Sequence, residues 1–195
     1  PGTLHSKEPM RVPEDIRGRN IRPAHATMAR FVNLMGGSSV QVPAPEARDM
    51  LARGGADALT FPWDSLFIFG IDSAVKHHID MPFYATTFVN VMNKARYEGL
   101  SEAHRKVIDD HCTPEWAQKM VTGWSKAEHE GKEKIKNAPD HTVYTPTEEE
   151  LQLWKDAAAP LLEEWKRNVT AAGHDAEAIY ARFREVFQKH DSLVE

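Results

Sequence analysis

Three residues at predicted strand ends could together bind a small organic anion. Arg22 closes a short apolar segment, and the aromatic residues Phe61 and Trp63 flank the proline at which a later strand ends. A guanidinium group offers two parallel donors to a carboxylate and keeps its charge at any physiological pH. Aromatic rings after a strand end can enclose an apolar part of a ligand. The alternatives are a surface arginine and two ordinary core aromatics.

Two further side chains are weaker candidates for the same site. His25 lies at the start of the helix that follows Arg22, where its ring and the helix dipole would both favour an anion. A solvated capping role is the alternative for His25. Phe88 would face the cleft from a second lobe, unless it is a core residue. No set of residues indicates catalysis, and we expect no cofactor.

The histidines do not indicate a metal site. His77 and His78 are adjacent and are expected on a helix, where neighbouring side chains point apart. His104 and His111 could share one face of a helix, but no acidic or cysteine partner lies at ligand spacing. We therefore expect no bound metal.

The elements that must position the candidate residues alternate between strands and helices over residues 13–63. Strands are predicted at 20–22, 39–42 and 56–61, and the first intervening helix has apolar residues three and four positions apart. Such an alternation implies parallel strands joined by right-handed crossovers. Ligands of parallel sheets bind outside the carboxyl ends of the strands, so the candidate residues are expected to meet there.

Outside this region the sequence predicts mainly helices. Residues 1–12 look like a tail or a segment that enters the fold, and residues 63–78 are expected to be largely helical. Alternating aromatic and β-branched residues in 81–93 predict one or two strands. A long helix is predicted over 114–137, and its apolar stripe stops at Trp124. Its polar second half is therefore expected to be solvated, and the helix is expected to cross between two lobes.

Capping signals delimit the carboxyl-terminal helices. Thr147 and Glu150 form a capping box ahead of a long helix, in which Pro160 should produce a kink. Asp175 caps the last helix.

Composition disfavours several classes of protein. The chain has 195 residues, of which 41% are hydrophobic, and this is enough to form a core. A net charge of −5 without a block of like charges disfavours a nucleic-acid surface. Apolar runs are far shorter than the roughly 20 residues that span a bilayer. No phosphate-binding loop, nucleophile elbow or dinucleotide-binding motif is present, so we do not expect an enzyme.

Several short motifs together resemble the solute-binding proteins of TRAP (tripartite ATP-independent periplasmic) transporters, the DctP-like family. Residues 13–22, PEDIRGRNIR, are similar to the family's PEDLKGLKIR, and residues 88–97, FVNVMNKARY, are similar to the start of its FVLVMNKAKYDSLP. In the family the arginine of the KIR motif holds the carboxylate of the ligand, and Arg22 matches that position. Shorter matches lie at 45–47, 55–58 and 62–63.

The resemblance implies an α/β fold of the periplasmic-binding-protein type, with two lobes, a parallel sheet in one lobe and long carboxyl-terminal helices. Residues 13–80 would form a βαβαβ ligand-binding lobe, and 81–112 a remnant of the second lobe. Residues 113–138 would form a lobe-bridging helix, and 139–195 helices packed on the first lobe. The match is to the carboxyl-terminal portion of the family only, so we expect the amino-terminal lobe to be largely absent.

The function implied by the resemblance is that of a periplasmic receptor. It would hold the carboxylate of an organic acid on Arg22 and deliver the acid to the permease subunits of a membrane transporter. The family often has a polar residue where Phe61 stands, which implies a less polar ligand than a simple dicarboxylate. No nucleic-acid partner is expected. Self-association is expected if the chain is a fragment, because the strands predicted around 83–91 would lack neighbours.

Two other classes of protein remain open. The effector domain of a transcriptional regulator has the same two-lobed plan and a similar length, although the chain shows no helix-turn-helix. A signal sequence in the parent gene would favour transport, and a DNA-binding region would favour regulation. An enzyme on an α/β scaffold is the third class, and fold alone would not support it.

Overall fold

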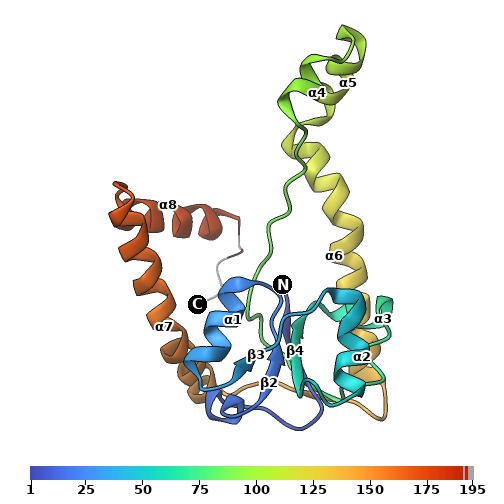
Figure 1. Cartoon of the computed structure of the whole chain (residues 1–195), viewed down its shortest axis with the longest axis vertical. Helices are drawn as coiled ribbons and strands as arrows, with labels where there is room; N and C mark the ends of the chain where they lie inside the picture. The colour runs from blue at the N-terminus through green and yellow to red at the C-terminus, as the bar shows by residue number, and fades with distance from the viewer. Residues whose placement is uncertain (191, 193–195) are drawn as a thin grey trace.

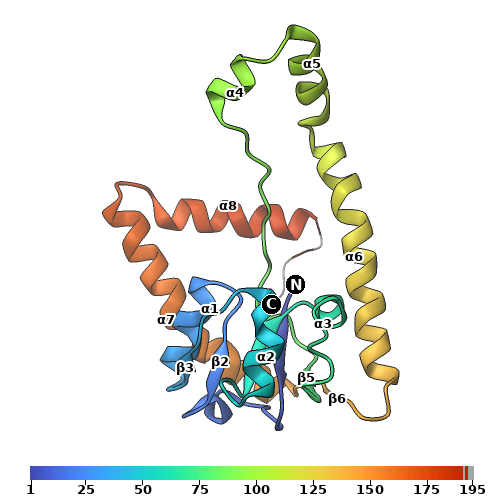
Figure 2. The same cartoon turned by 45° about the vertical axis from the view of Figure 1, so that its right-hand side comes forward.

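A mixed sheet of six strands forms the centre of the body (Figure 1, Figure 2). The structure is a computed structural model that describes residues 1–190 and residue 192. Its strands are β1 (Thr3–Ser6), β2 (Asn20–Arg22), β3 (Ser38–Ser39), β4 (Ala58–Phe61), β5 (His77–Ile79) and β6 (Thr142–Tyr144). They are arranged in the order β3-β2-β4-β1-β5-β6. The strands β3, β2 and β4 run parallel, as do β5 and β6, whereas β1 is antiparallel to both of its neighbours.

The expected α/β class is confirmed, and the predicted parallel crossovers connect β2, β3 and β4. The helix α1 (Ala26–Leu34) joins β2 to β3, and α2 (Ala47–Ala52), with the short helix η2 (Ala44–Glu46) before it, joins β3 to β4. A further short helix, η1 (Pro13–Ile16), precedes β2. In α1 the apolar residues recur on one face, and that face is buried. The strand β3 has only two residues and lies at the edge of the sheet.

The amino-terminal residues form the central strand, so the expectation of a tail at residues 1–12 is wrong. All four residues of β1 are buried between β4 and β5. Its polar side chains have partners inside the protein, since the Thr3 hydroxyl donates to the Ile79 carbonyl at 2.5 Å. Ser6 likewise donates to the Glu8 carbonyl at 2.6 Å. The expectation of a parallel sheet therefore holds for the two outer parts of the sheet and fails at β1.

Helices cover both faces of the sheet and divide the core into two clusters. One cluster joins the sheet to α1 and to α7 (Glu148–Ala171). The other joins it to α2, to α3 (Trp63–Ile68) and to the long helix α6 (Pro114–Asn137). Ala58 and Leu59 are adjacent on β4 but belong to different clusters, because successive side chains of a strand point to opposite faces.

The long helix α6 is unbroken over 24 residues, which confirms the predicted helix. Its buried residues, Gly131 and Ile135, lie in the carboxyl-terminal half, which packs against α3. The amino-terminal half rises away from the body (Figure 1). Its apolar residues are exposed at the surface, namely Trp116, Met120, Val121 and Trp124. The expectation of a solvated second half therefore holds for most of its residues and fails at Gly131 and Ile135, where this half packs against the body and the apolar half does not.

Between β5 and α6 the chain extends far from the sheet (Figure 2). The helices α4 (Lys94–Glu98) and α5 (Glu102–His111) lie at the far end of this arm. The strands predicted within residues 81–93 are wrong, because the described structure has only an isolated bridge there, between Gly2 and Tyr84. The alternating pattern finds no neighbouring strand and remains extended chain.

The helix expected over residues 63–78 is also wrong in its second half. The helix α3 ends at Ile68, and Gly70 follows with a φ of 61°, a left-handed conformation that favours glycine. His77 and His78 then lie on β5 instead of on a helix, and only His78 is buried.

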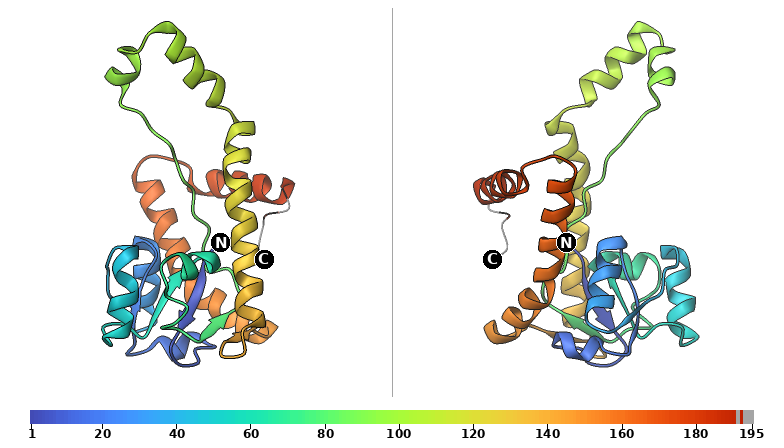
Figure 3. Two further views of the ribbon diagram at one scale, coloured as in Figure 1. Left: turned by 90° about the vertical axis from the view of Figure 1, so that its right-hand side faces the viewer. Right: turned by 60° about the vertical axis from the view of Figure 1, so that its left-hand side comes forward.

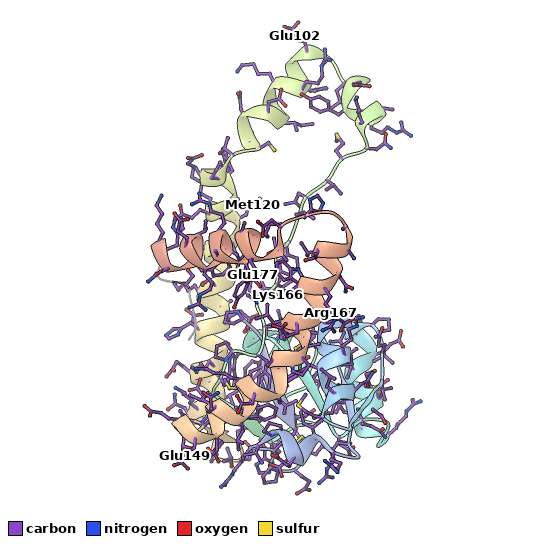
Figure 4. All side chains as sticks on the ribbon, turned by 90° about the vertical axis from the view of Figure 1, so that its left-hand side faces the viewer. Glu102, Met120, Glu149, Lys166, Arg167 and Glu177 are labelled. Carbon is purple, nitrogen blue, oxygen red and sulfur yellow. The ribbon has the colours of Figure 1, made fainter. Side chains whose placement is uncertain are left out.

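The helices α7 and α8 (Ala176–Lys189) form an outer pair. The predicted capping box begins α7, which contains Pro160 and changes direction along its length (Figure 3). Lys166 of α7 pairs with Glu177 of α8 at 2.8 Å, near the junction of the two helices (Figure 4). Over the described residues, none of the helices has the length and apolar character needed to cross a membrane.

Candidate ligand-binding site

Arg22 is the last residue of β2 and is only 8% exposed. Its Nε and Nη2 atoms both donate to the carbonyl of Val42, at 3.2 Å each. Its guanidinium carbon lies 5.3 Å from the centre of the Phe61 ring, close enough for a cation–π contact. With residues 23–25 and 41–43, Arg22 lines a pocket of about 300 Å³.

The charge of Arg22 has no carboxylate partner within the part of the chain that the structure describes. Burial lowers the pKa of its guanidinium below the ordinary value, and the nearby Tyr84 acts in the opposite direction. The group nevertheless keeps its proton, because a guanidinium does not deprotonate in proteins. A buried charge without a counter-ion is costly. The N–H groups that Arg22 does not use on Val42 could offer charge-assisted hydrogen bonds to an anion.

His25 and Tyr84 face each other beside Arg22. The two rings meet edge to face, with centres 5.0 Å apart. His25 is the N-cap residue of α1, but its side chain makes no capping hydrogen bond, so the capping alternative lacks support. Partial burial lowers the pKa of the His25 imidazole, which favours its neutral form. His25 can therefore offer one N–H donor to a ligand without adding a second full charge.

Tyr84 is a site residue that sequence reasoning missed. Burial raises the pKa of its hydroxyl well above the ordinary value, so the group remains a neutral hydrogen-bond donor. The backbone of Tyr84 is held by Gly2, whose N–H donates to the Tyr84 carbonyl at 3.0 Å. A Cβ atom on Gly2 would lie 2.1 Å from Cζ of the Tyr84 ring, so the ring requires glycine at that position. The sequence offers one signal for Tyr84, an aromatic residue within 81–93, and the alternating pattern of that segment favours a strand instead of a site.

A second, larger pocket of about 450 Å³ lies on the other side of Tyr84. Trp63, at the first position of α3, is 7% exposed and contributes one wall. Phe88 contributes another, with its ring 4.7 Å from that of Trp124 and its side chain 65% exposed. The core alternative for Phe88 is therefore wrong. The aromatic residues that line this pocket are Trp63, Tyr84, Phe88 and Trp124.

The two carboxylates and the lysine that line the larger pocket already have hydrogen-bond or ion-pair partners within the protein. Glu128 of α6 accepts hydrogen bonds from the backbone N–H of Asp64 at 2.8 Å and from the Trp124 indole at 2.7 Å. Lys132 pairs with Asp80 at 2.5 Å, and its Nζ lies 5.9 Å from the centre of the Trp63 ring. These groups therefore shape the larger pocket, whereas Arg22 of the smaller pocket is a cation without an acidic partner among the described residues.

The five candidate residues of the sequence thus lie around two adjacent pockets. Arg22 and His25 line the smaller pocket, with Phe61 packed against the guanidinium. Trp63 and Phe88 line the larger one. Tyr84 lines the larger pocket and contacts His25 of the smaller one, so it connects the two. The arrangement offers a cation, two neutral donors and an aromatic compartment, and no nucleophile–base pair is part of it.

This combination of a parallel strand end, a buried cation and an aromatic compartment is typical of a receptor for a small organic anion. Residues 3–168 match the model of the family described as bacterial extracellular solute-binding protein, family 7 (DctP). The chain therefore belongs to this family of solute-binding proteins. That finding favours the transport hypothesis over the regulator and the enzyme.

Solved structures of TRAP solute-binding proteins share the fold. One from a marine metagenome, specific for aromatic acids and holding 3-hydroxybenzoate, is 24% identical, with a TM-score of 0.82. One from Rhodoferax ferrireducens, holding copurified benzoate, is 24% identical, with a TM-score of 0.83. In both cases the match covers 98% of this chain and 61% of the other.

A periplasmic protein from Bordetella bronchiseptica, holding mandelate, is 20% identical, with a TM-score of 0.83, and the match covers 97% of this chain and 61% of that one. This chain thus spans about 61% of the length of each of these three structures. No curated protein sequence matches this chain.

Proposed function

We propose that this chain is the anion-holding part of a TRAP-type receptor, which captures an organic acid in the periplasm and delivers it to a membrane permease. The observation that carries the proposal is the guanidinium of Arg22. It is buried at the end of a parallel strand, opens on a pocket, and has no acidic partner among the described residues. Membership of the family supports the receptor class.

The ligand class that fits the site best is an aromatic monocarboxylic acid. The carboxylate would bind Arg22 and accept from the Tyr84 hydroxyl, and the ring of the acid would lie toward Trp63 and Phe88. Three observations support this choice: the ring of Phe61 beside the cation, the aromatic walls of the larger pocket, and its already paired charges. Structural neighbours hold benzoate, 3-hydroxybenzoate and mandelate, although another, from Pseudomonas aeruginosa, holds L-malate.

Binding by the purified chain tests the proposal, with benzoate, mandelate and malate as probes. We expect benzoate to raise the melting temperature more than malate does, because malate would bring a second carboxylate to a pocket whose lining already holds the carboxylates of Asp80 and Glu128. Stabilisation by none of these acids, or by malate alone, would contradict the proposed ligand class.

The role of Arg22 is tested by the substitution Arg22→Gln. Hydrogen bonds to charged groups are worth about 1.5–3 kcal/mol each, so we expect calorimetry to show benzoate affinity reduced by about 10- to 150-fold. Arg19→Gln is the matched control, because Arg19 lies in the same segment and is exposed. Equal benzoate affinity of the Arg22→Gln and Arg19→Gln chains would rule out the proposed role.

A further inference from the structure

We propose that His5, His78 and His141 are positioning residues of the binding site, joined with Lys76 in one hydrogen-bond network of fixed direction that holds Phe61 and Trp63 in place. The importance of those two residues for ligand binding rests on the proposed function. The direction of the network does not, and it can be measured without a ligand. We call these three side chains the histidine network.

The network crosses the sheet from the surface to the wall of the site. Lys76 Nζ lies 3.2 Å from His141 Nε2, and His141 Nδ1 lies 2.8 Å from His78 Nε2. His78 Nδ1 lies 2.7 Å from His5 Nδ1, and His5 Nε2 lies 3.1 Å from the Phe61 carbonyl oxygen. His5 and His78 are both fully buried, on adjacent strands β1 and β5.

The two ends of the network determine every proton within it. The Phe61 carbonyl can only accept, so His5 must donate from Nε2, and the neutral ring then accepts at Nδ1. His78 must therefore donate from Nδ1 and accept at Nε2, which requires His141 to donate from Nδ1. His141 Nε2 then accepts from the ammonium of Lys76, a group that can only donate. One set of neutral tautomers satisfies all four hydrogen bonds.

The cationic end of the network is itself held in place. Lys76 Nζ also donates to the Asp72 carbonyl at 3.1 Å and to the Asp140 carboxylate at 2.7 Å, so its three protons have three acceptors. The other titratable groups that face the network are His77, beside His78 on β5, and the carboxylate of Asp72. Burial lowers the pKa of His5 and of His78, so both rings stay neutral, as the fixed tautomers require.

The network ends at two residues of the proposed site. His5 binds the carbonyl of Phe61, the residue that packs against Arg22. The His5 ring also meets the Trp63 ring edge to face, with centres 5.0 Å apart, and the His78 ring lies 5.7 Å from Trp63. The last residue of β4 and the first residue of α3 thus contact β1 and β5 through imidazole groups. A change of tautomer in any one of the three rings would break a hydrogen bond between Lys76 and the Phe61 carbonyl.

Nuclear magnetic resonance of the ¹⁵N-labelled chain at neutral pH tests the direction of the network. We expect His5 to carry its proton on Nε2, and His78 and His141 to carry theirs on Nδ1. Assignment by single substitutions of each histidine resolves the three rings among the 10 in the chain. A proton on Nε2 of His78, or a charged ring at His5 or His78, would overturn the proposal. The tautomers are measured in the unmodified chain, and through-bond correlations from each ring to its own backbone assign the rings where a variant does not fold.

The positioning role is tested by the indole N–H resonance of Trp63 and by benzoate affinity in four variants. His5→Leu and His78→Leu are expected to shift the resonance and to weaken benzoate binding about tenfold or more. His5→Gln keeps an amide donor near the place of Nε2 and is expected to retain both properties. His77→Leu is the matched control, because the neighbouring ring makes no hydrogen bond within the described structure.

Each outcome of these measurements has one meaning. An unchanged Trp63 resonance in His5→Leu, or a His77→Leu effect as large as that of His78→Leu, would refute the positioning role. Tautomers as expected in a chain that binds no acid would leave the network standing and would contradict the proposed function alone.

Discussion

Arg22 keeps a full charge inside the protein, whereas His5 and His78 remain neutral there. A guanidinium cannot release its proton at any accessible pH, so its burial has to be balanced by partners. Those partners are the Val42 carbonyl, the Phe61 ring and, in our proposal, the carboxylate of the ligand. An imidazole can release its proton, so burial lowers its pKa instead.

The neutral histidines should make the folded state less stable in acid. Burial lowers the pKa of His5 to about 3 and of His78 to about 2, from an ordinary value of 6.5. Below pH 6.5 the unfolded chain binds protons that the folded chain does not, so stability is complete above pH 6.5 and is lost as the pH falls toward those lowered values. Each ring contributes about 1.4 kcal/mol per pH unit in that window.

Urea denaturation at a series of pH values checks this prediction. The free energy of unfolding should fall by about 2.7 kcal/mol per pH unit from these two rings, well below pH 6.5. In His78→Asn the slope should be smaller by about 1.4 kcal/mol per pH unit, whereas His77→Asn should keep it. A free energy of unfolding that is constant between pH 6.5 and pH 4.5 would contradict the burial of neutral histidines.

At the scale of elements, the helices that could be predicted best are those with a local capping signal. Ser101, Thr113, Thr147 and Asp175 each accept a hydrogen bond from the backbone of the helix that they begin. The strand β1 has no such signal. Its sequence, Thr-Leu-His-Ser, has one apolar residue, and its polar side chains are satisfied by partners from distant strands.

Residues 81–93 show the opposite case, a strand pattern in the sequence that forms no strand. The same cause limits how much of the site can be predicted. Their alternation is typical of a strand, but a strand also needs a neighbour, and only Gly2 pairs with Tyr84 there. Arg22 could be predicted as a candidate because the residues next to it in the sequence mark the end of its strand. Tyr84 and the histidine network could not, since their contacts depend on which strands become neighbours.

The contact between α6 and α3 leads to a prediction with an internal control. A Cβ on Gly131 would lie 2.6 Å from the backbone N and Cα of Asp64, and backbone atoms cannot move aside cheaply. Gly131→Ala should therefore destabilise the fold by about 1–3 kcal/mol, despite the better helix propensity of alanine. Denaturation of the two chains by urea measures the difference.

Gly123 lies in the same helix, but apart from its chain neighbours and the backbone of that helix no atom lies within 4 Å of the position of its Cβ. Gly123→Ala should therefore stabilise the chain by up to about 1 kcal/mol through helix propensity alone. Equal effects of the two substitutions would show that α6 does not approach α3 as closely as described.

At the scale of the whole molecule, apolar surface collects on the parts that project from the body. Phe88 and Val91 of the arm and Met120 of α6 are more than half exposed, and Phe183 of α8 is 54% exposed. Figure 4 shows Met120 high on α6, away from the sheet. Faces of this kind favour association between protein molecules.

We therefore predict that the chain self-associates at concentrations of about 10–100 µM, measured by sedimentation or light scattering. Met120→Glu should weaken the association, because it would place a charge in the contact. Gln118→Glu adds the same charge nearby and serves as the control. A chain that stays monomeric throughout this range would contradict the prediction.

The position of β1 also has a consequence for how the chain reaches its folded state. The sheet consists of two parallel pieces, β3-β2-β4 and β5-β6, and β1 is the strand that joins them. The crossovers within the first piece are short, so that piece can assemble early. The link between the pieces must wait for His5 to meet His78, 73 positions along the chain. Closing so large a loop costs entropy before any contact offsets it, so the joining of the two halves should set the pace of folding.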